Sequence, residues 1–191
     1  MTEKVARQLA DFAVENNVIK SEDHDLYIYS YQVMIERVVS WTCVLLISLF
    51  FGTLFYTFIF AVFFGTLSMF VGGSHAPSFK ACFLISIGIF LGFSISQPFI
   101  TAHLSVSIML VIIFACGLLI GLLGPIADRN KPMSDKELMR CKKAAIIVLA
   151  VELAVACAVA ATGNKQVVVF ILFSFVTVGL SLLIAHVKAK T

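Results

Sequence analysis

The stretch VGGSHAPSFKAC, residues 71–82, separates two long runs of sequence that carry no charged side chain. The first run extends from Val38 to Phe79 and the second from Ala81 to Ala127. A membrane span needs about 20 apolar residues, so each run holds about two spans. The two glycines and the proline indicate a loop between the runs, followed by the start of a new helix near Pro77 or Ser78.

The composition is that of an integral membrane protein. Of the 191 residues, 60% are hydrophobic and only 13% are charged, and the mean hydropathy is +1.02. A soluble domain needs more charge on its surface than this. We therefore expect an all-α, polytopic protein of about six transmembrane helices with amphipathic helices at its N-terminus. It forms a single membrane domain over residues 1–191, with the lipid bilayer as its surroundings, and it needs no cofactor and no nucleic acid.

The polar N-terminal part, residues 1–37, predicts two helices before the first span. Apolar residues recur at helical spacing over residues 1–20, and Asn16-Asn17 ends that helix. Ser21 begins a second helix that leads into the membrane. The first helix either lies on the headgroups or the bundle, or docks a helix of a substrate.

The later spans follow from length and from residues that break helices. As one helix, Val38–Gly72 would be about 52 Å long, so we divide it near Gly52 to Thr57. Pro98 to His103 divides the second run. The expected remaining parts are the spans Ala81–Gln97, Leu104–Leu123, Ala144–Thr162 and Gln166–Val187, the loops 73–80 and 124–143, and the tail 188–191.

The distribution of basic residues predicts the orientation. Six spans place both termini and both loops on one side of the membrane. Lys165 is the only one of the 14 Lys and Arg residues on the other side. The positive-inside rule then makes the basic side cytoplasmic.

His75 and Cys82 are the best candidates for catalysis. On one continuous helix they would be about 10 Å apart along the axis, too far for a hydrogen bond. A break at Pro77 instead puts Cys82 near the positive end of a new helix, where a thiolate is favoured and Lys80 is near. His75 on the loop can then fold back to take the thiol proton. The alternative is an inert cysteine with a histidine that reaches the headgroups, and two ligands are too few for a metal site.

Other polar residues in or near the spans carry weaker signals. Glu152 is the one charged residue inside an expected span, so it is either paired within the bundle or functional. Asp128 and Glu152 are both candidates for orienting His75. Cys141 is a competing thiol among basic residues, and the remaining cysteines, Cys43, Cys116 and Cys157, are packing residues in the spans. The odd number and these positions predict reduced thiols.

The basic loop has two interpretations. It contacts anionic lipid and fixes the topology, or it recognises an acidic peptide segment. Its candidate binding residues are Arg129, Lys131, Arg140, Lys142 and Lys143, and we add Lys80 from the first loop.

These motifs together resemble the accessory gene regulator B (AgrB) family of membrane peptidases. The likeness rests on Gly72-Gly73-Ser74-His75-Ala76 followed by Cys82, and on the loop from Gly124-Pro125 through Lys142-Lys143. It covers nearly the whole chain. Many members carry an arginine pair before the glycines, where this chain has Ser68-Met69.

The resemblance implies a cysteine endopeptidase of the bacterial plasma membrane that processes a quorum-sensing signal peptide. Its substrate is a short amphipathic precursor (AgrD-like), and the enzyme is expected to be a homodimer. Cys82 would form a thioester with the precursor as its acidic tail leaves, and the peptide would then close to a thiolactone or lactone. Amides near Gly72 and Gly73, or at the start of the Cys82 helix, would bind the oxyanion.

The rival hypothesis is a protein without enzymatic activity, a small membrane transporter or scaffold. It rests on Glu152 and on the spans that glycines interrupt. The sequence shows no clear inverted repeat in its favour.

Overall fold

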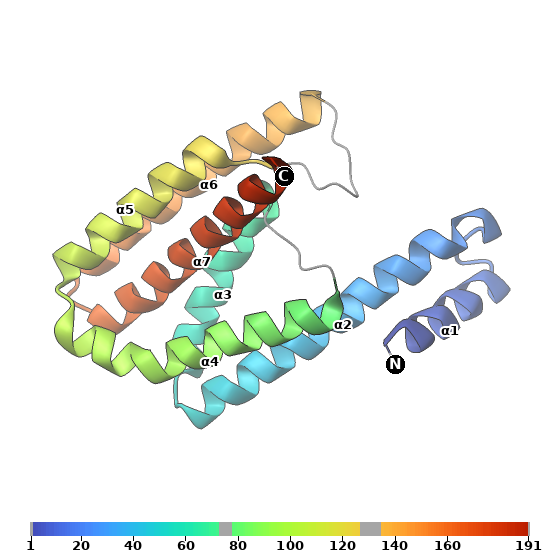
Figure 1. The fold of residues 1–191 in the computed structure, drawn as a ribbon, viewed down its shortest axis with the longest axis horizontal. Helices are drawn as coiled ribbons and strands as arrows, with labels where there is room; N and C mark the ends of the chain where they lie inside the picture. The colour runs from blue at the N-terminus through green and yellow to red at the C-terminus, as the bar shows by residue number, and fades with distance from the viewer. Residues whose placement is uncertain (1, 73–77, 127–134, 191) are drawn as a thin grey trace. The chain divides into compact units, whose positions relative to one another are not determined.

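The computed structural model describes residues 2–72, 78–126 and 135–190, and within these ranges it consists of helices with short connections. Figure 1 shows the order of the helices along the chain. They are α1 (Thr2–Glu15), a 3₁₀ turn η1 (Ser21–Asp23), α2 (His24–Phe50), α3 (Leu54–Val71), α4 (Phe79–His103), α5 (Val106–Leu123), α6 (Asp135–Ala161) and α7 (Lys165–Lys190).

Six of the described helices, α2 to α7, are long and apolar enough to cross a bilayer. The remaining one, α1, is amphipathic, and Asn16 and Asn17 follow its end as expected. The prediction of an all-α membrane protein with about six spans and an amphipathic N-terminus is therefore confirmed. All five cysteines lie among the described residues, and none is paired with another.

Local chemistry explains where several helices end and begin. Gly52, with φ of +66°, lies between α2 and α3, inside the division expected near Gly52 to Thr57. Ser105 caps α5, because its side chain accepts a hydrogen bond from the Ile108 amide at 3.3 Å. In the turn before α7, Gly163 has φ of +76°, and the Asn164 side chain accepts a bond from the Val167 amide at 3.3 Å.

Several expected boundaries differ from the structure. Helix α4 begins at Phe79, inside the expected loop 73–80, and α7 continues to Lys190, through most of the expected tail 188–191. Pro98 lies inside α4, which continues to His103, so the break comes at Leu104 and Ser105 instead. A proline removes one backbone hydrogen bond, and a membrane helix tolerates that loss where neighbouring groups compensate. Helix α6 begins at Asp135, so the second half of the expected loop 124–143 is helical.

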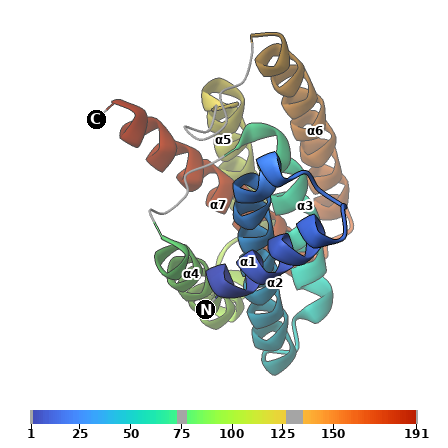
Figure 2. The same ribbon diagram turned by 90° about the vertical axis from the view of Figure 1, so that its right-hand side faces the viewer.

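The chain divides into two compact units, each described here by itself. The first comprises Met1–Ile47 and Ala76–Leu91. In it α1 packs on the first half of α2, with Ala6 and Ala10 buried against Ile28. The two helices lie side by side in both Figure 1 and Figure 2. His24 and Asp11 add a hydrogen bond of 2.7 Å between Nε2 and Oδ1.

The second unit comprises Ser48–His75 and Gly92–Thr191, and α7 is its most buried span. Helix α7 packs against α3, α5 and α6, and α6 also packs against α3 and α5. A stack of aromatic rings joins α7 to two neighbours. The Phe173 ring lies 3.8 Å from that of Phe93 on α4 and 4.8 Å from that of Phe60 on α3, measured between centroids. Phe170 meets Phe93 edge to face at 5.0 Å.

We predict that Phe173→Ala destabilises the second unit strongly. The change removes the middle ring of the stack and leaves a cavity, which costs about 3 kcal/mol or more in the free energy of unfolding. Phe58→Ala is the matched control, because the Phe58 side chain is 67% exposed. Denaturant unfolding of the purified protein in detergent compares the two variants. Equal losses of stability in both would show that the stack does not hold the unit together.

Candidate functional site

Cys82 lies near the start of α4, where the sequence placed it. Ser78 caps the helix: its hydroxyl accepts a hydrogen bond from the Ala81 amide at 3.3 Å. The Cys82 amide donates to the Ser78 carbonyl at 3.0 Å, which is the first backbone bond of the helix. The thiol is partly exposed. Cys82 is therefore held by regular helix geometry just past the first turn.

At the C-terminal end of α3 the backbone turns sharply at Gly72. Its φ is +75° and its ψ is −159°, a combination that is essentially restricted to glycine. The Gly72 amide donates to the Ser68 carbonyl at 3.1 Å. A Cβ atom at Gly72 would lie 2.9 Å from the carbonyl oxygen of Ile126. Both the conformation and the space at this position therefore require glycine.

Gly124, which follows α5, makes the other half of this contact. A Cβ atom there would lie only 2.7 Å from Cγ1 of Val71. The Ile126 amide donates to the Val71 carbonyl at 3.1 Å. The end of α3 and the residues that leave α5 thus cross at backbone contact, and we call Val71, Gly72, Gly124 and Ile126 the junction. The segment that carries His75 and the basic segment after α5 both begin there.

Several candidates from the sequence lie outside the described residues. These are Gly73, His75, Asp128, Arg129 and Lys131. The pairing of His75 with Cys82 and the orienting role of Asp128 therefore stay predictions.

The described basic candidates lie on helices rather than in loops. Lys80 is in the first turn of α4, and Arg140, Lys142 and Lys143 are in the first three turns of α6. All four side chains are exposed. On α6, Arg140 and Lys143 are three residues apart and share one side of the helix, whereas Lys142 lies on the opposite side from Arg140.

Glu152 on α6 is buried, with 7% of its surface exposed, and it contacts α3. Its Oε1 atom lies 2.5 Å from Oγ1 of Thr66. Its Oε2 atom has no hydrogen-bond partner among the described residues. The sequence singled out Glu152 but missed Thr66, because a threonine in an apolar helix carries no signal of its own.

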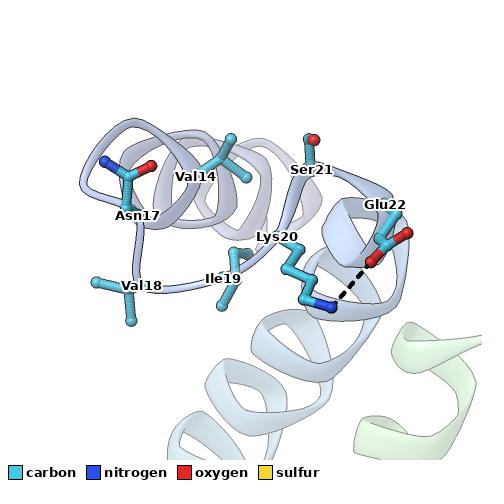
Figure 3. A pocket seen from close by; sticks show the side chains of 7 residues that line it. All are labelled: Val14, Asn17, Val18, Ile19, Lys20, Ser21 and Glu22. Atoms are coloured by element: carbon cyan, nitrogen blue, oxygen red, sulfur yellow. Dashed lines mark ion pairs between the residues drawn. The ribbon is translucent and has the colours of Figure 1, made fainter.

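A shallow hollow lies at the turn between α1 and α2 and contains none of the predicted site residues. Figure 3 shows its side chains and the ion pair between Lys20 and Glu22, whose atoms are 3.2 Å apart. The residues that line the hollow are Val14, Asn17, Val18, Ile19, Lys20, Ser21 and Glu22.

We predict that Gly72→Ala disturbs the junction. The methyl group meets the Ile126 carbonyl and the backbone conformation is strained, so the cost is about 1–3 kcal/mol. Gly65→Ala, on the same helix, is the control: nothing lies within 4 Å of its Cβ position, and alanine favours the helix by about 0.5–1 kcal/mol. Thermal unfolding in detergent measures both. A Gly72→Ala protein as stable as Gly65→Ala would contradict the described crossing.

A comparison with known proteins bears on the whole chain. The family model described as accessory gene regulator B matches residues 4–184. No curated protein and no solved structure matches the chain. The match covers both units, the junction, Cys82 and Glu152. The chain belongs to the accessory gene regulator B family.

Proposed function

We propose that this multi-pass membrane protein is a cysteine endopeptidase that cuts and cyclises a short signal-peptide precursor. Membership of the family suggests a role in processing a quorum-sensing peptide. The observation that carries the proposal is the place of Cys82, which lies just past the cap of α4 in a chain of this family. A partly exposed thiol near the positive end of a helix suits a nucleophile.

The reaction proceeds through a thioester on Cys82. His75 takes the thiol proton, and the sulfur attacks a backbone carbonyl of the precursor. The C–N bond breaks, and the imidazolium returns its proton to the amine of the leaving tail. A thiol or hydroxyl within the precursor then attacks the thioester. His75 takes the proton of the attacking group and passes it to the Cys82 sulfur as that sulfur leaves, and the peptide closes to a thiolactone or lactone.

The oxyanion of each tetrahedral intermediate needs hydrogen-bond donors. The Gly72 amide already donates to Ser68, so we assign Gly72 to shaping the backbone. The amides of Phe79 and Lys80 at the start of α4 are better donors, because helix geometry leaves them without partners inside the helix, whereas the amides of Ala81 and Cys82 already donate to Ser78. They lie next to Cys82 along the chain. Gly73 remains a further candidate.

The exposed basic residues suit the acidic tail of the precursor. Lys80 lies two residues before the nucleophile, and Arg140, Lys142 and Lys143 lie on α6. Arg129 and Lys131 belong to the segment that begins at the junction. Charge complementarity would hold the tail while the amphipathic part of the precursor lies in the membrane interface.

We place the active site, both termini and the basic residues on the cytoplasmic side, following the bias of Lys and Arg. This orientation puts the thiol in a reducing compartment. It also places the site where a newly made precursor would reach it. In line with the family resemblance, we propose that the enzyme acts as a homodimer.

Replacing either catalytic residue should abolish precursor cleavage. Cys82→Ala removes the nucleophile and His75→Ala its base, while Cys82→Ser should lose most activity because a hydroxyl is a poorer nucleophile near neutral pH. Cys141→Ala is the matched control and should cleave normally. Immunoblots of a precursor with a tagged tail, co-expressed with each variant, report cleavage. Cleavage by the Cys82→Ala protein would disprove the proposed mechanism.

The orientation can be tested separately with a membrane-impermeant maleimide. In a variant that keeps Cys82 and lacks the other four cysteines, we expect no labelling in intact cells and labelling after permeabilisation. Thr162→Cys in a cysteine-free chain, in the exposed turn before α7, should be labelled in intact cells. The reverse pattern would invert the topology and place the thiol outside.

A further inference from the structure

Glu152 is a carboxyl group inside a span, and its surroundings indicate what it does. It lies in the middle of α6, about 14 Å along the axis from Ala161 and about 21 Å from Leu138, the two ends of the span. A charged group at that depth is costly, so such residues face the protein interior and pair there. The Glu152 side chain is 93% buried and contacts Thr66 on α3.

The hydrogen bonds around Thr66 can be counted. Its Oγ1 atom lies 2.6 Å from the Val62 carbonyl oxygen and 2.5 Å from Oε1 of Glu152, with the Phe63 carbonyl oxygen farther away at 3.3 Å. Two oxygen–oxygen contacts this short need two protons, and a hydroxyl has only one. With the Thr66 proton on the Val62 carbonyl, the second proton belongs to Glu152. A neutral acid also fits an Oε2 atom that has no partner among the described residues, since a buried charge would need one.

This bond ties α3 to α6 close to the junction. Thr66 precedes Val71 by five residues, which is about 7.5 Å along the helix. Apolar packing between membrane helices leaves rotation and height weakly specified, because lipid is as apolar as the helix surface. A buried hydrogen bond fixes both. Another bond holds the same helix, since the Ile126 amide donates to the Val71 carbonyl at 3.1 Å. The Ser174 hydroxyl adds less to it, because it lies 3.0 Å from the Phe170 carbonyl of its own helix and 3.3 Å from that of Phe60.

We propose that Glu152 is a positioning residue. As a neutral acid bonded to Thr66, it fixes the end of α3 and thereby the start of the segment that carries His75. The inference rests on the proposed function for its effect on catalysis, because the imidazole must be held beside the Cys82 sulfur. Glu152 itself does not contact the substrate and takes no part in proton transfer during the reaction.

The first test compares conservative and disruptive variants by kinetics. The purified protein in lipid nanodiscs is given the precursor, and kcat and KM are measured. Glu152→Leu and Thr66→Val should each lower kcat about 10-fold, the effect of one lost buried hydrogen bond, with KM within about 2-fold. Glu152→Gln and Thr66→Ser keep a hydrogen-bonding group and should stay within about 3-fold of wild type. The Glu152→Leu/Thr66→Val double variant should be no slower than the slower single variant.

Two kinetic outcomes would overturn the proposal. One is a Glu152→Leu protein with unchanged kcat. The other is a Glu152→Gln protein as impaired as Glu152→Leu, which would mean that the acid itself is needed, as in proton transfer or transport.

The second test measures the position of α3 without using catalysis. Val71 is fully buried, so a cysteine placed there in a cysteine-free chain should react slowly with a maleimide. We expect Glu152→Leu to raise that rate about 10-fold or more and Glu152→Gln to leave it unchanged. An unchanged rate in Glu152→Leu would disprove the positioning role. Because labelling does not depend on Cys82, it separates this failure from a failure of the proposed peptidase mechanism.

Discussion

The backbone crossing at the junction is the constraint on which the proposed site depends. The Ile126 amide donates to the Val71 carbonyl. A Cβ atom at Gly72 would collide with the Ile126 carbonyl oxygen, and one at Gly124 would collide with the Val71 side chain. A contact this close leaves little freedom for the chain on either side. The segment that carries His75 and the segment rich in basic residues therefore both begin, along the chain, at this crossing. The bond also gives the Val71 carbonyl, one of the last of α3, a partner that the helix itself does not supply.

The second unit is held by few polar ties in an otherwise apolar structure. The aromatic stack around Phe173 packs α7 against α3 and α4, while the Thr66–Glu152 bond sets how α3 is oriented against α6. In lipid, apolar contact alone does not choose between rotations of a helix, because the tails solvate its surface as well as a neighbour does. The few buried polar groups therefore specify the arrangement far out of proportion to their number. The first unit works differently, since α1 packs its small alanines on α2 and carries its charges on its exposed side.

The sequence predicted much of the fold because the membrane imposes simple rules. The two uncharged runs and the thickness of a bilayer were enough for six spans, and the length of Val38–Gly72 was enough to place a break near Gly52. The predicted division of the second run is wrong because it treats Pro98 as a helix break. A proline in a membrane helix removes one backbone hydrogen bond and need not end the helix. The start of α6 was misplaced since its first turns have the charged composition of a loop, although lysine, leucine and arginine are good helix formers.

The site was predictable only where the signal is local. Ser78 and Pro77 indicated a new helix, and the structure places Cys82 just past its first turn. The crossing of Val71 with Ile126 and the bond between Thr66 and Glu152 join residues far apart in the chain, so no spacing rule finds them.

The central claim is that Cys82 carries the acyl group, and trapping that intermediate tests it most directly. Protein mixed briefly with precursor, quenched in acid and digested should yield a hydroxylamine-sensitive adduct of the N-terminal part of the precursor on the Cys82 peptide. An adduct on Cys141 instead, or cleavage with no adduct on any cysteine, would contradict the account.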